Sequence, residues 1–286
     1  MILFLTYGLS VVITPHCRNP DSAPFLNFPN LLEIPMLIVI PVTKSDQHLA
    51  VPLLSLMVKL GGVRPHKILF EFSSLISGDL RSELHELGAQ CGEIFSRELK
   101  TTDERGWPRS ANSVFSETAL HVFEEKSYGE KSWYFFELDN TPMCRGWVQK
   151  LQDEYELARL PCMGVVNKTI RGTAELRKQD GSHLVGTSIY PADLWSRVKL
   201  CRHINMLTDP FDVVMQWETV KISHHTELIQ HSWGTHKYSK KGARIECKAV
   251  ANRPGSSDYA NPVSPRAVVV HGCKDSSLAK LVEDKL

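Results

Sequence analysis

Two carboxylates, one residue apart, follow an aromatic run that has the composition of a buried strand. The run covers residues 132–136, and Glu137-Leu138-Asp139 comes directly after it. Short apolar runs bounded by turn residues are typical of strands buried in a sheet. Carboxylate oxygens suit Mg²⁺ or Mn²⁺, and these ions in turn hold phosphate oxygens. Because open α/β sheets bind ligands at the carboxyl ends of their strands, this segment is a candidate metal and diphosphate site.

A second predicted strand, at 266–270, also ends in residues that suit this chemistry, His271 and, three residues later, Lys274. A parallel sheet brings the carboxyl ends of its strands together, so we expect His271 near Glu137 and Asp139. Two carboxylates and an imidazole suit Mn²⁺, and a lysine can neutralise a phosphate oxygen. Each feature also has a structural alternative: a turn for the carboxylates, a buried strand end for the histidine and a surface ion pair for the lysine.

The elements that must position these residues alternate between strand and helix. Continuous apolar runs at 36–42 and 66–72 predict strands buried on both faces. Helical spacing follows each of them, at 46–60 and 79–89. The order strand, helix, strand indicates a right-handed parallel crossover.

Shorter patterns cover the rest of the chain. They predict a polar surface loop at 94–109, a helix at 113–125 capped by Asn112 or Ser113, a helix at 146–160, strands at 163–166 and 183–191, and a closing helix at 277–285. Residues 1–35 are rich in Pro, Asn and Ser and are predicted to be an irregular leader, so one ordered domain is expected from 36 to 286.

Composition limits the function classes. The chain has 286 residues, 42% of them hydrophobic, and a formal net charge of +1, which argues against holding nucleic acid by bulk electrostatics. A basic stretch is either a local patch or a solvated loop: Lys237, Lys240, Lys241 and Arg244. Seven scattered cysteines without a Cys-x-x-Cys motif favour reduced thiols and a cytoplasmic location. The apolar N-terminus is too short and interrupted to span a membrane.

Taken together, the two strand-end motifs resemble those of GT-A-fold glycosyltransferases. These enzymes carry an acidic DxD-type motif, here in the variant form Glu137-Leu138-Asp139, and several have a C-terminal His-Gly-x-x-Lys pattern, matched by residues 271–274. The resemblance implies a Rossmann-like α/β fold with a mostly parallel central sheet flanked by helices. It also implies Asp139 as the direct metal ligand, with Glu137 and His271, and Lys274 on the diphosphate. His231 is the rival of His271 as the metal ligand.

The resemblance further implies that the domain has two functional halves, a nucleotide-binding half at 36–166 and an acceptor half at 167–286. The implied activity is metal-dependent transfer of a sugar from a nucleotide sugar, most simply a UDP-sugar, with Mn²⁺ or Mg²⁺. The acceptor is a glycan, a protein or a modified DNA base. Residues 133–164 also resemble uncharacterised phage and bacterial proteins of glycosyltransferase type, which would place a phage-encoded protein in the host cytoplasm. The alternatives are a nucleotidyltransferase and a non-catalytic nucleotide-sugar-binding module.

Five further residues are candidates, each with a structural alternative. Arg109 and Asn112 precede or begin a helix and either touch the nucleotide phosphates or form a helix cap. Gly186 either lines the acceptor pocket or belongs to a tight strand. Asp212 is either the general base for an acceptor hydroxyl or a helix N-cap. Asp46 either meets the nucleobase or ribose or caps a helix.

Overall fold

The computed structural model describes residues 35–100, 106–167, 182–231, 263–274 and 276–286. Residues 1–34 of the expected leader and the whole basic stretch at 237–244 lie outside the described residues. Within the described part, no helix is both long enough and apolar enough to cross a membrane.

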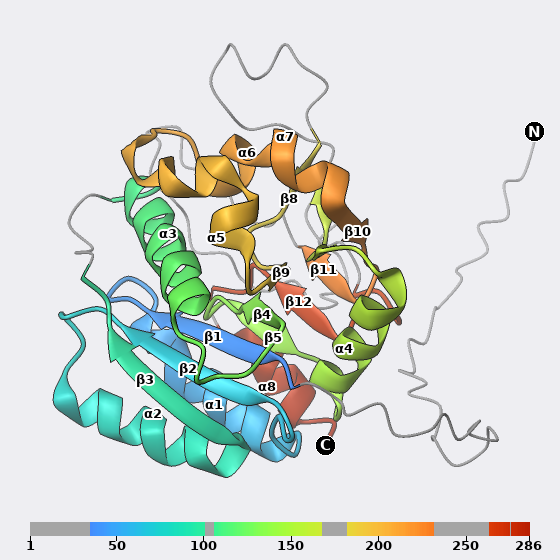
Figure 1. The fold of residues 1–286 in the computed structure, drawn as a ribbon. Helices are drawn as coiled ribbons and strands as arrows, with labels where there is room; N and C mark the ends of the chain where they lie inside the picture. The colour runs from blue at the N-terminus through green and yellow to red at the C-terminus, as the bar shows by residue number, and fades with distance from the viewer. Residues whose placement is uncertain (1–34, 101–105, 168–181, 232–262, 275) are drawn as a thin grey trace, which may run out of the picture.

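The centre of the fold is a seven-stranded sheet with the order β10-β6-β9-β4-β1-β2-β3 (Figure 1). Its strands are β1 (Leu37–Val42), β2 (Lys67–Phe72), β3 (Glu93–Glu98), β4 (Ser132–Phe135), β6 (Cys162–Gly164), β9 (Ile189–Pro191) and β10 (Ser223–His225). β1 pairs in parallel with β2 and β4, while β9 runs antiparallel to β4 and β6. The expected mostly parallel sheet flanked by helices is confirmed.

Helices cover both faces of this sheet, and each face has its own core. Successive side chains of a strand point to opposite faces, so Leu37 and Val39 pack in one core while Ile38 and Ile40 pack in the other. α1 (Ala50–Lys59) and α2 (Gly78–Cys91) lie on one side, and α3 (Arg109–Glu124) lies on the other (Figure 1). This double burial explains why β1 reads as a continuous apolar run.

The loop predicted at 94–109 is wrong in its first half. Residues Glu93–Glu98 form β3, which pairs in parallel with β2 along its whole length. β3 is the last strand of the sheet, and most of its side chains are exposed or half-buried. An edge strand does not need the apolar run by which buried strands are recognised, so the polar sequence concealed it.

The second predicted strand end belongs to a different sheet from the first, which corrects the expected arrangement. β12 (Val269–His271) is the middle strand of a three-stranded sheet, between β11 (Ile229–His231) and β5 (Asn140–Pro142). β5 and β12 are antiparallel. The two motifs therefore meet because the chain turns from β4 into β5, and not because β4 and β12 are neighbours in one parallel sheet.

The remaining elements are short, apart from α4. They are α4 (Trp147–Ala158), α5 (Leu194–Arg197), α6 (Phe211–Val214), α7 (Gln216–Thr219), α8 (Ser277–Glu283), the pair β7 (Val166–Asn167) and β8 (His183–Leu184), and 3₁₀ turns at Gln47–Leu49, Lys199–Arg202, Ile204–Met206 and Val220–Ile222. The single strand expected at 183–191 is thus divided between β8 and β9, with a connection at 185–188 that faces the site described next.

Candidate functional site

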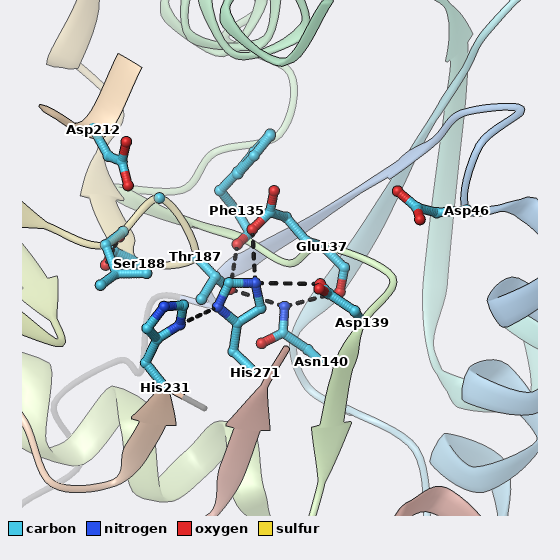
Figure 2. Close-up of polar contacts among 12 residues, drawn as sticks. Asp46, Phe135, Glu137, Asp139, Asn140, Thr187, Ser188, Asp212, His231 and His271 are labelled. Carbon is cyan, nitrogen blue, oxygen red and sulfur yellow. Dashed lines mark hydrogen bonds and ion pairs between the residues drawn. The ribbon is translucent and has the colours of Figure 1, made fainter. Parts of the chain in front are cut away.

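The structure brings Glu137, Asp139 and His271 into direct contact (Figure 2). His271 Nε2 lies 3.0 Å from Glu137 Oε2 and 3.2 Å from Asp139 Oδ1. Asp139 and His271 are buried, while Glu137 is half-buried. The carboxylates and the imidazole predicted at two strand ends therefore form one cluster.

Backbone pairing fixes this contact. His271 stands opposite Asn140 in the antiparallel pair of β12 and β5. Beyond β12, the N–H groups of Gly272 and Cys273 both donate to the carbonyl oxygen of Asp139, at 3.1 Å each. Gly272 has φ +103°, a left-handed conformation that favours glycine. The glycine of the His-Gly-x-x-Lys pattern thus shapes the turn that folds the chain back over the acidic motif.

Lys274 joins the cluster at the end of that turn. Its Nζ lies 2.8 Å from Asp139 Oδ2 and 3.5 Å from Asp46 Oδ1. Its carbonyl oxygen lies 3.4 Å from His48 Nε2. Asp46 follows the carboxyl end of β1, so the structure brings this predicted residue to the lysine.

The charges in the cluster balance one another. Burial alone would raise the pKa of Asp139, but the positive charges of His271 and Lys274 hold it well below its usual value. Burial alone would lower the pKa of His271, but Asp139 and Glu137 raise it to about 10. Burial alone would also lower the pKa of Lys274, but the negative charge of Asp139 outweighs the effect of burial and raises that pKa. Asp139 is therefore ionised, with a positive charge facing each of its oxygens.

The donor set fits a divalent cation. One ligand atom each from Glu137, Asp139 and His271 lies within 4.8 Å of the others. Ligands sit about 2.0–2.6 Å from Mg²⁺ or Ca²⁺, so two ligands of one such ion are at most ~5 Å apart. Two carboxylate oxygens and one imidazole nitrogen suit Mn²⁺ among the divalent ions. A cation at this position would also take over the positive charge that His271 now offers to the two carboxylates.

Asn140 is a site residue that sequence reasoning missed. Its side-chain amide donates to the carbonyl oxygen of Glu137 and to Thr187 Oγ1, at 2.8 Å each. Thr187 in turn donates to the carbonyl oxygen of Phe135. Both side chains are buried. They tie the acidic motif to the 185–188 connection, and the only sequence signal was the turn-forming composition of Asp-Asn-Thr-Pro.

Asp212, the predicted general base, lies near the cluster but has no described contact with its members. In Figure 2 it stands on the opposite side of the cluster from Asp46. Burial raises its pKa to about 6, opposed by backbone hydrogen bonds from Val213 and Gly186 and assisted by the charge of Glu137. His183 Nε2 is 3.9 Å away. Because burial lowers the pKa of His183 to about 4, that imidazole is neutral at neutral pH and the contact is not an ion pair.

Gly186 has a packing reason to be glycine. A Cβ there would lie 2.5 Å from Cζ of Phe211, whose ring stacks on Phe115 with centroids 4.0 Å apart. The ring cannot move away freely, so Gly186→Ala is expected to lower the free energy of unfolding by about 1–3 kcal/mol. Urea unfolding measures this, with Gly78→Ala as the control because nothing lies within 4 Å of its Cβ. Equal stability of the two variants would contradict the packing argument.

Arg109 and Asn112 are not brought to the cluster by any described contact. α3 begins at Arg109, so the expected N-cap at residue 112 or 113 is wrong. Asn112 is fully buried inside the helix, and its Nδ2 donates to the carbonyl oxygens of Ile204, Leu207 and Asp209. The observed role of Asn112 is to hold the chain that leads to α6. Arg109 is exposed in the first turn of α3.

His231 and His271, named as rivals for the metal, lie next to each other. Their Nδ1 atoms are 2.7 Å apart. Nε2 of His271 faces the carboxylates, whereas His231 contacts the far side of the His271 ring (Figure 2). The structure thus gives the two histidines different positions, one inside the cluster and one behind it.

No protein-family model and no curated protein sequence matches this chain. Solved glycosyltransferase structures do resemble it. Mouse xyloside xylosyltransferase 1, in its apo form, has a TM-score of 0.52 at 10% identity, over 84% of this chain and 98% of that one. The galactosyltransferase LgtC, in complex with donor and acceptor sugar analogs, has a TM-score of 0.52 at 10% identity, and the match covers 87% of this chain and 94% of LgtC. GlyE of Streptococcus pneumoniae has a TM-score of 0.50 at 9% identity, and the match covers 88% of this chain and 60% of GlyE.

These comparisons define the class of fold. The matched structures are glycosyltransferases of the GT-A type, and the chain shares their mixed α/β architecture around a mostly parallel sheet. At identities near 10%, the likeness establishes the GT-A fold, while the reaction must be argued from the site.

Proposed function

We propose that this protein is a metal-dependent glycosyltransferase that uses a nucleotide-sugar donor. The observation that carries the proposal is the contact of Glu137, Asp139, His271 and Lys274 at the carboxyl end of β4 in a GT-A fold. Open α/β sheets bind ligands at this edge. The same cluster on an unrelated surface would be a structural ion-pair network, so fold and site support the function jointly.

Each member of the cluster has a distinct task under this proposal. Asp139, Glu137 and His271 would hold Mn²⁺ or Mg²⁺, which when bound supplies positive charge to both phosphates of the donor. Lys274 lies 2.8 Å from Asp139, so its ammonium would lie beside the diphosphate, where negative charge would develop as the sugar departs. Asp46 would orient the ribose or the base next to Lys274. Asp212 would accept the proton of the attacking hydroxyl group.

The proposed substrates follow from this arrangement. A UDP-sugar is the proposed donor, with 36–166 as the nucleotide-binding half and 167–286 as the acceptor half. LgtC, which shares the fold, was solved with donor and acceptor sugar analogs, and this supports two adjoining subsites here. A glycan, a protein or a modified DNA base is the proposed acceptor. Arg109 and Gly186 stay proposed nucleotide and acceptor contacts, and a cytoplasmic location stays part of the proposal.

One observation favours a second candidate, a nucleotide-sugar-binding module without catalysis. Asp139 already has a positive group at each oxygen, His271 on one and Lys274 on the other. Such a balanced cluster can exist without any ion, because each buried charge already has a partner. A nucleotidyltransferase, the other alternative, would more often show a glycine-rich loop and a lysine just after β1. Residues 43–46 include Lys44 but no glycine, so this alternative ranks lower.

Incubation with a panel of nucleotide sugars tests the proposal. The full chain is expected to release nucleoside diphosphate from one donor by slow hydrolysis when Mn²⁺ is present, and EDTA should stop the release. Nucleotide binding without any release would favour the non-catalytic module. Pyrophosphate release from a nucleoside triphosphate and a sugar phosphate would favour the nucleotidyltransferase. No turnover and no Mn²⁺-dependent nucleotide binding would exclude the proposed function.

A further inference from the structure

His231 and His271 face each other across two paired strands. They are direct partners in the parallel pair of β11 and β12. Their ring centroids are 4.7 Å apart with 32° between the ring planes, and the Nδ1 atoms are separated by 2.7 Å. His271 also stands opposite Asn140 on β5. One row across the three-stranded sheet therefore runs from His231 through His271 to the residue that follows Asp139.

Proton positions in this contact follow from its geometry. Two imidazole nitrogens at hydrogen-bond distance need one proton between them, so one Nδ1 donates and the other accepts. For His271 Nε2 to offer a lone pair to a metal ion, the proton of a neutral His271 ring must sit on Nδ1. His271 Nδ1–H is then the donor and His231 Nδ1 is the acceptor, which leaves the proton of His231 on its Nε2.

We propose that His231 is a positioning residue, which accepts a hydrogen bond from His271 Nδ1 and so fixes the tautomer and the ring orientation of His271 for a divalent cation. The inference rests on the proposed metal site and goes beyond it, because His231 itself is not a ligand. Ligating histidines commonly donate their other N–H to a carboxylate, a carbonyl oxygen or water. Here a second imidazole takes that role.

The ring of His271 already has the orientation that a cation would need. Its Nε2 faces Glu137 and Asp139, and its Nδ1 faces His231. A cation held by Nε2 would therefore require no rotation of the ring, and the contact at Nδ1 would stay in place.

Titration of the full-length protein with Mn²⁺ alone tests the role of His231, with free Mn²⁺ followed by electron paramagnetic resonance. His231→Leu should weaken Mn²⁺ binding by about 10–100-fold, the usual cost of losing such a partner. His231→Asn, whose amide oxygen can reach the position of Nδ1, should recover most of the affinity. His224→Asn is the control, because the half-buried His224 contacts Glu154 and, among the described contacts, no member of the cluster.

A second readout separates orientation from general stability. Replacement of Mn²⁺ by Co²⁺ should give a visible absorption band whose position shifts in His231→Leu and is restored in His231→Asn. If His231→Leu does not fold, His231→Gln replaces it, because its longer side chain places the amide away from the Nδ1 position and should not restore binding. Parent-like affinity and an unshifted band in His231→Leu, or in His231→Gln, would overturn the role of His231. Absence of Mn²⁺ binding by the parent would instead overturn the metal site, and the inference with it.

Discussion

Asp139→Asn is expected to abolish Mn²⁺-dependent hydrolysis of the donor, with a fall in rate of at least ~10²-fold, the size expected when one preorganised electrostatic contact is lost. The amide keeps the shape of the side chain and removes its charge. His271 and Lys274 then lose the charged carboxylate between them, whose oxygens lie 3.2 Å and 2.8 Å from their nitrogens. The variant therefore offers a divalent ion a neutral oxygen in place of a charged one and should bind it far more weakly.

The same substitution should also lower the stability of the ion-free protein. Removing one partner of a buried ion pair costs about 3–5 kcal/mol, and the full figure is an upper bound here because Lys274 keeps 23% of its side chain exposed. Urea unfolding with and without Mn²⁺ separates the two effects. Mn²⁺ should stabilise the parent, since a ligand that binds only the native state raises its stability, and it should leave the variant unchanged.

The exposed Asp153 on α4 offers a matched control, because its carboxylate contacts only Gln149 among the described contacts. Asp153→Asn should keep the activity and the response of stability to Mn²⁺. Asp139→Asn with parent-like hydrolysis would remove Asp139 from the site. If Asp139→Asn lowers the stability but still binds Mn²⁺, the role of Asp139 is structural only.

Much of the site could be predicted because its residues follow recognisable strands. The aromatic run before Glu137 and the apolar run before His271 identify strand ends, and metal-type residues at two such ends are a specific signal. The reason given for their meeting was nevertheless wrong. β5 and β12 have three residues each, and antiparallel pairing between such short segments leaves no periodicity in the sequence to detect.

Contacts between distant segments could not be predicted from the sequence. Asp46 reaches Lys274, and Asn140 reaches Thr187, only because the folded chain brings the corresponding loops together. Asn112 shows the converse limit. Its position before an amphipathic segment favoured a helix cap. In the structure Asn112 lies inside α3, and its buried side chain donates hydrogen bonds to three backbone carbonyl oxygens. Polar residues that satisfy buried backbone groups look the same in a sequence as residues that cap or bind.

Asp212→Asn should reduce turnover by about 10²–10⁴-fold, the contribution typical of general acid–base catalysis. Mn²⁺ and nucleotide binding should change far less than turnover, because Asp212 has no described contact with the metal cluster and interacts only through the charge of Glu137. An asparagine oxygen can still accept the hydrogen bond from the N–H of Val213, 2.9 Å from Asp212 Oδ1. The substitution therefore removes the proton acceptor while it keeps the start of α6 intact.

The pH dependence of turnover gives an independent reading of the same carboxyl group. Burial raises the pKa of Asp212 to about 6, and a general base must be deprotonated to act. Turnover at saturating donor and acceptor should therefore fall as the pH drops through about 6, and the residual turnover of Asp212→Asn should lack this step. Asp209→Asn, three residues earlier in the same segment, should behave as the parent. If Asp212→Asn keeps both the rate and the pH step, Asp212 only begins a helix and the proton goes to another group. In that case the contact of Asp212 with the backbone of Gly186 and Val213 explains its burial without catalysis.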